Sequence, residues 1–136
     1  MKRILLTLVA VICGLILASC GSSGPSTTIN VTMTDFQFQP SQFSVPAGQE
    51  ITLNATNNGA VIHNFVIMKL GTTAGDAFST DDEVNVYWEE VDIQPGGDIS
   101  VTFTAPTEPG EYQIVCRTEG HIASGMVASL TVVPGE

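Results

Sequence analysis

Short segments in which apolar and polar residues alternate make up almost the whole chain from residue 28 onward. Alternation with a period of two places the apolar side chains on one face of a β-strand, and the many β-branched residues favour the same structure. Glycine, proline and asparagine mark turns at Pro46-Ala-Gly48, Asn57-Asn-Gly59 and Gln94-Pro-Gly-Gly97. No long segment has helical periodicity. We therefore expect strands near residues 28–38, 43–45, 51–56, 63–68, 84–91, 99–103, 112–116 and 127–133.

Seven to eight short strands at this spacing predict an all-β fold, an antiparallel Greek-key β-sandwich or barrel. The mature chain of roughly 115 residues has the length of one domain. An immunoglobulin-type domain has a similar strand pattern, but its inter-sheet disulfide needs two cysteines. Only Cys116 lies beyond residue 20. Sandwiches of that type without cysteines exist, so this alternative stays open.

The N-terminal residues have the composition of a bacterial lipoprotein signal. Met1-Lys2-Arg3 is basic, residues 4–17 are apolar, and Leu17-Ala-Ser-Cys20 resembles a lipobox. We expect residues 1–19 to be a signal peptide, residues 20–28 a flexible linker anchored by lipid at Cys20, and residues 29–136 the folded domain. The protein would then be extracytoplasmic, held to a bacterial membrane on its periplasmic or outer cell-surface side. An ordinary signal or an uncleaved anchor is the alternative.

Acidic residues dominate the charge of the mature chain. Beyond residue 20, two basic residues (Lys69 and Arg117) stand against fourteen acidic ones, which gives a net charge of −12 with neutral histidines. Such a surface repels nucleic acid and anionic lipid headgroups and favours a basic partner. A role in solubility explains the acidity equally well.

One short segment carries a thiol, an imidazole and a thioether, in Cys116, His121 and Met126. Cys116 ends the penultimate expected strand and Met126 begins the last one, while His63 begins its strand after a turn. Both histidines and the thiol therefore fall at strand ends that one pole of a sandwich can bring together. A thiolate and two imidazoles with a weak thioether are the donors of blue-copper sites. On the cysteine alone, an inert buried side chain is an equal possibility.

The sequence around these residues resembles the cupredoxins, a family of small type 1 blue-copper proteins. His63-Asn64, Pro109-Gly-Glu-Tyr-Gln-Ile-Val-Cys116, Gly120-His121 and Gly125-Met126 carry the resemblance, which covers residues 28–133. The five-residue steps from Cys116 to His121 and from His121 to Met126 are most similar to those of the auracyanins.

The resemblance implies that His63, Cys116 and His121 are strong copper ligands and that Met126 is a weak axial one. It also implies that the backbone N–H of Asn64 donates to the cysteine sulfur, while its side chain ties the two ligand loops together. Family members often carry proline and an uncharged residue between the cysteine and the histidine, where this chain has Arg117-Thr-Glu119. Arg117 and Glu119 either pair with each other or shape a docking face.

Two histidines are too few for a second copper site, and one cysteine in the domain excludes a dinuclear centre bridged by two thiolates. We therefore expect an electron carrier and not an enzyme, shuttling single electrons between redox partners in a respiratory or photosynthetic chain. A copper-storage or copper-delivery lipoprotein and a metal-free interaction domain are the alternatives. We expect electrons to pass through the edge of His121, with Ile62, Ile122 and Ala123 in an apolar docking patch. Acidic groups at 81–83 and 89–90 would steer a basic cytochrome or a membrane redox complex.

Overall fold

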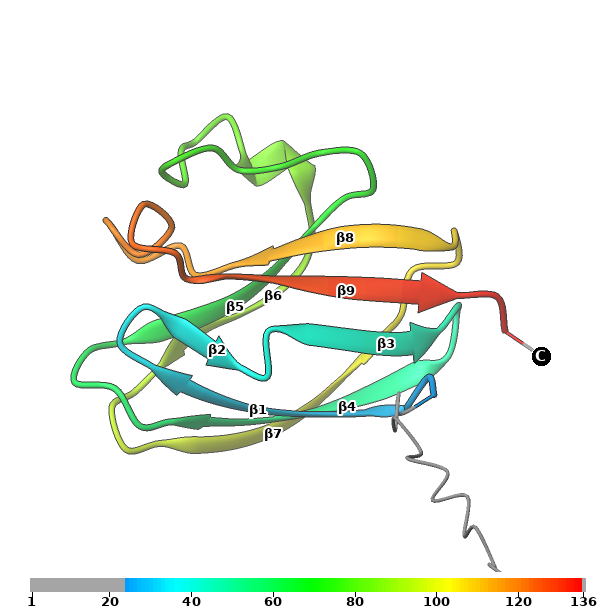
Figure 1. Ribbon diagram of the computed structural model, residues 1–136, viewed down its shortest axis with the longest axis horizontal. Coiled ribbons are helices and arrows are strands. Elements are labelled where there is room, and N and C mark those ends of the chain that lie inside the picture. The colour runs from blue at the N-terminus through cyan, green and yellow to red at the C-terminus, as the bar shows by residue number, and fades with distance from the viewer. Residues whose placement is uncertain (1–23, 136) are drawn as a thin grey trace, which may run out of the picture.

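The computed structural model describes residues 24–135 as two β-sheets packed face to face (Figure 1). The predicted signal peptide and the lipidation site at Cys20 lie outside these residues. Within the described range, no helix is long and apolar enough to cross a membrane. The predicted all-β sandwich is confirmed, and the described residues contain nine strands and one 3₁₀ turn, η1 (Glu83–Asn85).

The first sheet has four strands in the order β2-β1-β4-β7. Its strands are β1 (Thr28–Thr34), β2 (Gln37–Gln39), β4 (Glu50–Asn57) and β7 (Asp98–Thr104). The pairing of β1 with β4 is parallel, whereas β1 with β2 and β4 with β7 are antiparallel. Because β1 and β4 run in the same direction, the start of β1 lies at the opposite end of the sheet from the end of β4.

The second sheet has five strands in the order β3-β9-β8-β5-β6. Its strands are β3 (Gln42–Pro46), β5 (His63–Met68), β6 (Val86–Ile93), β8 (Gly110–Val115) and β9 (Val127–Val133). β3 pairs with β9 in parallel, and the other pairs are antiparallel. The sequence predicted an antiparallel sandwich, which the two parallel pairs, β1 with β4 and β3 with β9, correct. Two parallel pairs arise because the chain crosses between the sheets, which brings strands distant in sequence together.

The core lies between the sheets and follows the predicted alternation. In β4, for example, Ile51, Leu53 and Ala55 are buried while the residues between them are partly exposed. Phe65 is fully buried near the middle and makes edge-to-face contacts with Phe38 and Phe43, at ring-centroid distances of 5.7 Å and 6.0 Å. Aromatic pairs of this kind stabilise a core beyond the area they bury.

A second apolar cluster covers the outer face of the five-stranded sheet. It contains five buried residues, with Phe78, Val86 and Val127 packed against them: Val66, Met68, Ala74, Val115 and Ile122. The segment between β5 and β6 arches over this face at the top of Figure 1. All six residues of β5 are consequently buried, the polar His63 and Asn64 as well as the apolar run at 65–68.

The expected strand over residues 28–38 is interrupted in the structure. Phe36 has a φ of 67° and is 44% exposed, so it forms part of the turn between β1 and β2 instead of continuing the strand. A bulky residue rarely adopts a positive φ. The aromatic side chain thus points to the surface at the end of the sandwich where β4 ends and β5 begins.

Candidate metal centre

Three loops meet at one end of the sandwich, on the left in Figure 1. They are the turn between β1 and β2, the connection from β4 to β5, and the loop between β8 and β9. Cys116 directly follows β8, and His63 is the first residue of β5. The strand directions therefore bring the histidines and the thiol to one end of the sandwich, as the sequence predicted.

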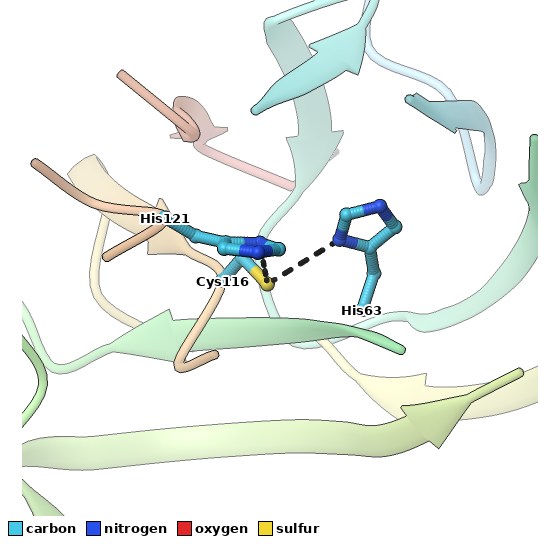
Figure 2. A group of neighbouring side chains, drawn as sticks. All are labelled: His63, Cys116 and His121. Atoms are coloured by element: carbon cyan, nitrogen blue, oxygen red, sulfur yellow. Dashed lines mark hydrogen bonds between the residues drawn. The ribbon is translucent and has the colours of Figure 1, made fainter. Parts of the chain in front are cut away.

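The two histidine side chains converge on the cysteine sulfur, as Figure 2 shows. The Nδ1 atom of His63 lies 3.7 Å from the Sγ atom of Cys116, and the Nδ1 atom of His121 lies 3.4 Å from it. The three donor atoms lie within 4.8 Å of one another. Cys116 and His63 are fully buried and His121 is 5% exposed. Among the described residues, no other group of this kind gathers His, Cys, Asp or Glu donors.

The loop between β8 and β9 turns back on itself and returns Met126 to the cysteine. The N–H of Met126 donates to the carbonyl of His121 (2.9 Å), and the N–H of Cys116 donates to the carbonyl of Met126 (3.3 Å). Gly120 and Gly125 have φ values of 79° and 96°, which glycine adopts without strain. The side chain of Met126 is fully buried. Its backbone therefore bonds to both neighbouring candidate ligands.

Asn64 connects the strand of His63 to the loop of Cys116. Its backbone N–H donates to the Cys116 sulfur (3.4 Å), and its side-chain Nδ2 donates to Thr118 Oγ1 (3.0 Å). Its Oδ1 accepts from the N–H of Asp92 (3.1 Å) in β6. Asn64 has the contacts that the resemblance implied. Such bonds hold a sulfur ligand in place and withdraw charge from it.

The environment keeps both histidines neutral near neutral pH. Burial lowers the pKa of His63, the nearby His121 lowers it further, and the Asp35 carboxylate acts in the opposite direction. Burial also lowers the pKa of His121, again opposed by Asp35. A neutral imidazole has a free lone pair for a metal ion. Two neutral imidazoles whose Nδ1 atoms converge on one buried sulfur fit a soft, mononuclear metal site.

Arg117 pairs with two other acidic residues and not with Glu119. Its guanidinium donates to Glu89 (2.6 Å) and Glu83 (3.1 Å), and it lies 5.1 Å above the ring of Phe78. These contacts tie the ligand loop to β6, to η1 and to the segment that covers the sheet. Glu119 is exposed. That Arg117 and Glu119 shape a docking face stays a prediction. Two of the acidic groups expected to steer a partner are therefore partly neutralised by Arg117.

The surface next to His121 differs from the docking patch predicted from sequence. Ile62 is 38% exposed and Ala123 is exposed, but Ile122 is only 8% exposed because it packs in the second apolar cluster. Sequence analysis did not identify Phe36, whose ring meets His121 edge-to-face at a centroid distance of 5.2 Å. Val61 is also exposed, at 44%. We call Phe36, Val61, Ile62 and Ala123 the apolar patch.

This fold and this donor set define a class, the mononuclear blue-copper electron carriers. The sequence model of a cupredoxin-like domain matches residues 7–128, and the chain belongs to the cupredoxin family. Cupredoxin homologues bind one type 1 copper ion, and homologues such as auracyanin and plastocyanin are electron carriers and not enzymes. The predictions of copper and of a non-enzymatic role are confirmed at this level.

Individual relatives agree with this assignment. Auracyanin-A of Chloroflexus aurantiacus is 30% identical in an alignment that covers 88% of this chain and 90% of that protein. The structure of an auracyanin from Roseiflexus castenholzii matches with a TM-score of 0.69 at 32% identity, over 82% of this chain and 100% of that one. The copper-resistant cuproprotein CopI of Rubrivivax gelatinosus is 30% identical over 115 residues, covering 77% of this chain and 66% of that protein.

Acid should destabilise the metal-free protein through its two histidines. Because folding lowers both histidine pKa values below their ordinary 6.5, the unfolded chain binds more protons in this range. Stability is therefore full above about pH 6.5 and is lost as the pH falls toward the folded-state pKa values. Urea unfolding of the metal-free protein from about pH 7.5 to about pH 5 measures this loss, above the range in which most carboxylates titrate. In a variant with both His63→Gln and His121→Gln, the free energy of unfolding should depend much less on pH. An equal pH dependence in that variant would contradict the prediction.

Proposed function

We propose that this protein carries single electrons on one copper ion held by His63, Cys116 and His121, with Met126 as the weak axial ligand. The observation that supports it best is the convergence of both histidine Nδ1 atoms on the Cys116 sulfur. The copper supplies a one-electron couple between Cu(I) and Cu(II). The chain's own residues keep water away through their burial and fix the donors in place through Asn64 and Arg117. A rigid site of this kind changes little between the two oxidation states.

Copper titration of the purified domain, residues 24–136, tests this proposal. One equivalent of Cu(II) should give an intense blue colour, and voltammetry should then show a reversible one-electron wave. A colourless protein that binds copper, or a coloured one without a reversible wave, would overturn the electron-carrier role.

A copper-handling role is the second candidate, because CopI is among the relatives. A storage or delivery protein has to release its ion, whereas an electron carrier retains it through many cycles. Transfer of Cu(I) to a chelator of moderate affinity separates the two. Rapid and complete transfer favours handling, and retention with fast redox cycling favours electron transfer.

The membrane attachment of the protein belongs to the same proposal. We infer that residues 1–19 are removed as a signal peptide, that Cys20 carries a lipid, and that the protein works in a respiratory or photosynthetic chain. Thr28 begins β1 at the end of the sandwich opposite to the site, since β1 runs parallel to β4 (Figure 1). A tether from that end would leave the apolar patch facing away from the anchor. Cys20→Ala should move the protein from the membrane to the soluble fraction.

Docking at the apolar patch is expected to limit the rate of electron transfer. Replacing Ile62 with asparagine removes apolar surface without changing the net charge, so oxidation by a basic c-type cytochrome should slow about tenfold. Stopped-flow kinetics at fixed ionic strength measure this rate. Val84, which is 71% exposed on η1, provides the matched control in Val84→Asn. Equal slowing in both variants would place the docking surface elsewhere.

A further inference from the structure

One nitrogen of the site has no hydrogen-bond partner. Among the described residues, the Nε2 atom of His63 is the single buried side-chain nitrogen or oxygen in this condition. Figure 2 shows this atom directed away from Cys116, on the far side of the ring from Nδ1. A neutral imidazole carries its proton on one nitrogen only, so Nε2 has to carry it when Nδ1 offers its lone pair to a metal. A buried N–H without an acceptor is costly, and such atoms call for an explanation.

The carboxylate of Asp35 is the charged group that faces this nitrogen. Asp35 lies in the turn between β1 and β2, and its Oδ1 atom is 3.8 Å from His63 Nε2. The same oxygen accepts the backbone N–H of Ala60 at 2.9 Å, which holds the carboxylate against the connection from β4 to β5. The Asp35 side chain is 47% exposed, so its charge is partly solvated.

Gly59 makes the approach of the two groups possible. A Cβ atom at this position would lie 2.4 Å from His63 Nε2 and 2.6 Å from Asp35 Oδ1. Buried Asn57 fixes this glycine, because its Oδ1 accepts the Gly59 N–H (2.8 Å) while its Nδ2 donates to the carbonyls of Val61 (2.9 Å) and Ile93 (2.8 Å). The Asn57 oxygen is thus already engaged. The Gly59 backbone therefore leaves room between Nε2 and the carboxylate, and the side chain of any other residue at this position would fill that room.

We propose that Asp35 is a positioning residue for the copper site, whose carboxylate takes the Nε2–H of His63. This inference rests on the proposed function, in which Nδ1 of His63 binds copper. A carboxylate on the outer nitrogen of a metal-bound histidine fixes the ring and raises its basicity. Its negative charge also favours Cu(II) over Cu(I). Asp35 therefore lowers the reduction potential of the site.

Two substitutions remove the charge of Asp35 and differ only in whether they keep its hydrogen bond with Ala60. Asp35→Asn keeps an oxygen for the Ala60 N–H, whereas Asp35→Ala removes it. Both variants should bind Cu(II) about 10- to 100-fold more weakly, with a smaller change for Cu(I). A tenfold loss confined to Cu(II) corresponds to a rise of about 59 mV in the one-electron potential. Glu119→Gln is the matched control, because it removes an exposed charge from the ligand loop and should leave the affinity ratio nearly unchanged.

NMR of the metal-free protein tests the contact without copper. The chain has only two histidines, so their ring nitrogens are readily assigned. The Nε2–H of His63 should give a slowly exchanging, downfield signal that moves upfield in Asp35→Asn and exchanges rapidly in Asp35→Ala. An unchanged signal together with an unchanged Cu(II)/Cu(I) affinity ratio would overturn the proposal. If the domain bound no copper but the signal responded, the contact would stand and the proposed function would fail.

Discussion

Replacing Cys116 with serine is expected to abolish the blue colour of the copper-loaded protein completely. The intense absorption of such sites needs a thiolate bound to Cu(II), and a serine oxygen is a hard donor that does not replace it. Cys116 is fully buried and the substitution changes little in volume, so the fold should be retained. Both histidine Nδ1 atoms face this sulfur, and among the described residues these three form the single such group of His, Cys, Asp or Glu donors. Visible absorption after adding one equivalent of Cu(II) gives the answer, with circular dichroism as the check on folding.

The two other cysteines supply the control for this experiment. Cys13 and Cys20 lie in the N-terminal residues, so Cys20→Ser in the full-length chain should keep the whole absorption. A Cys116→Ser protein that stays blue would show that copper is bound somewhere else. A protein that lost the colour in both variants would mean that the N-terminal thiol contributes to the site.

The sandwich was predictable because the pattern of apolar residues that forms each strand lies within a short segment of sequence. Alternating apolar residues such as Ile51, Leu53 and Ala55 define a buried face from sequence alone. β5 was recognisable from its continuous apolar run at 65–68. The parallel pairing of β1 with β4 was not predictable, since it depends on how the chain crosses between the sheets. The break at Phe36 was also missed, because alternation alone does not reveal a residue with positive φ.

The candidate ligands were predictable for a different reason: the chain contains very few residues that can bind copper. The chain has two histidines and one cysteine beyond residue 20, so few combinations were possible. The contacts that support them depend on packing between distant segments. Arg117 bonds to Glu83 and Glu89, which are 34 and 28 residues away. Ile122 was expected in the docking patch because the residues at this predicted pole are small or apolar, yet it packs in the buried cluster beneath the segment between β5 and β6.

Asn64→Ala is expected to destabilise the metal-free protein by about 2 kcal/mol, because it leaves partners of a buried side chain unsatisfied. Asn64 is 5% exposed and lies at an irregularity of the sheet, where His63 pairs with Ile93 but Phe65 pairs with Glu90. Two residues of β6 thus stand opposite one residue of β5. The second of them, Asp92, has a φ of 58°, and its N–H is held by the Asn64 side chain. Loss of that side chain also frees Thr118 and with it the ligand loop.

Urea unfolding followed by the fluorescence of Trp88, the single tryptophan, measures this effect. Asn54→Ala is the matched control: Asn54 also links neighbouring strands through its side chain, to Asn30 and Ser100, but on the solvent-facing side of β4. That variant should lose only about 0.5 kcal/mol, as is usual at the surface. Copper-loaded Asn64→Ala should remain blue, since all four ligands are intact. Its reduction potential should fall, because the side chain's Nδ2–H, 3.9 Å from the sulfur, no longer withdraws charge from it. Equal destabilisation by the two alanine substitutions would mean that Asn64 is an ordinary cross-strand residue, and that the two ligand loops are held together by Arg117 and the backbone alone.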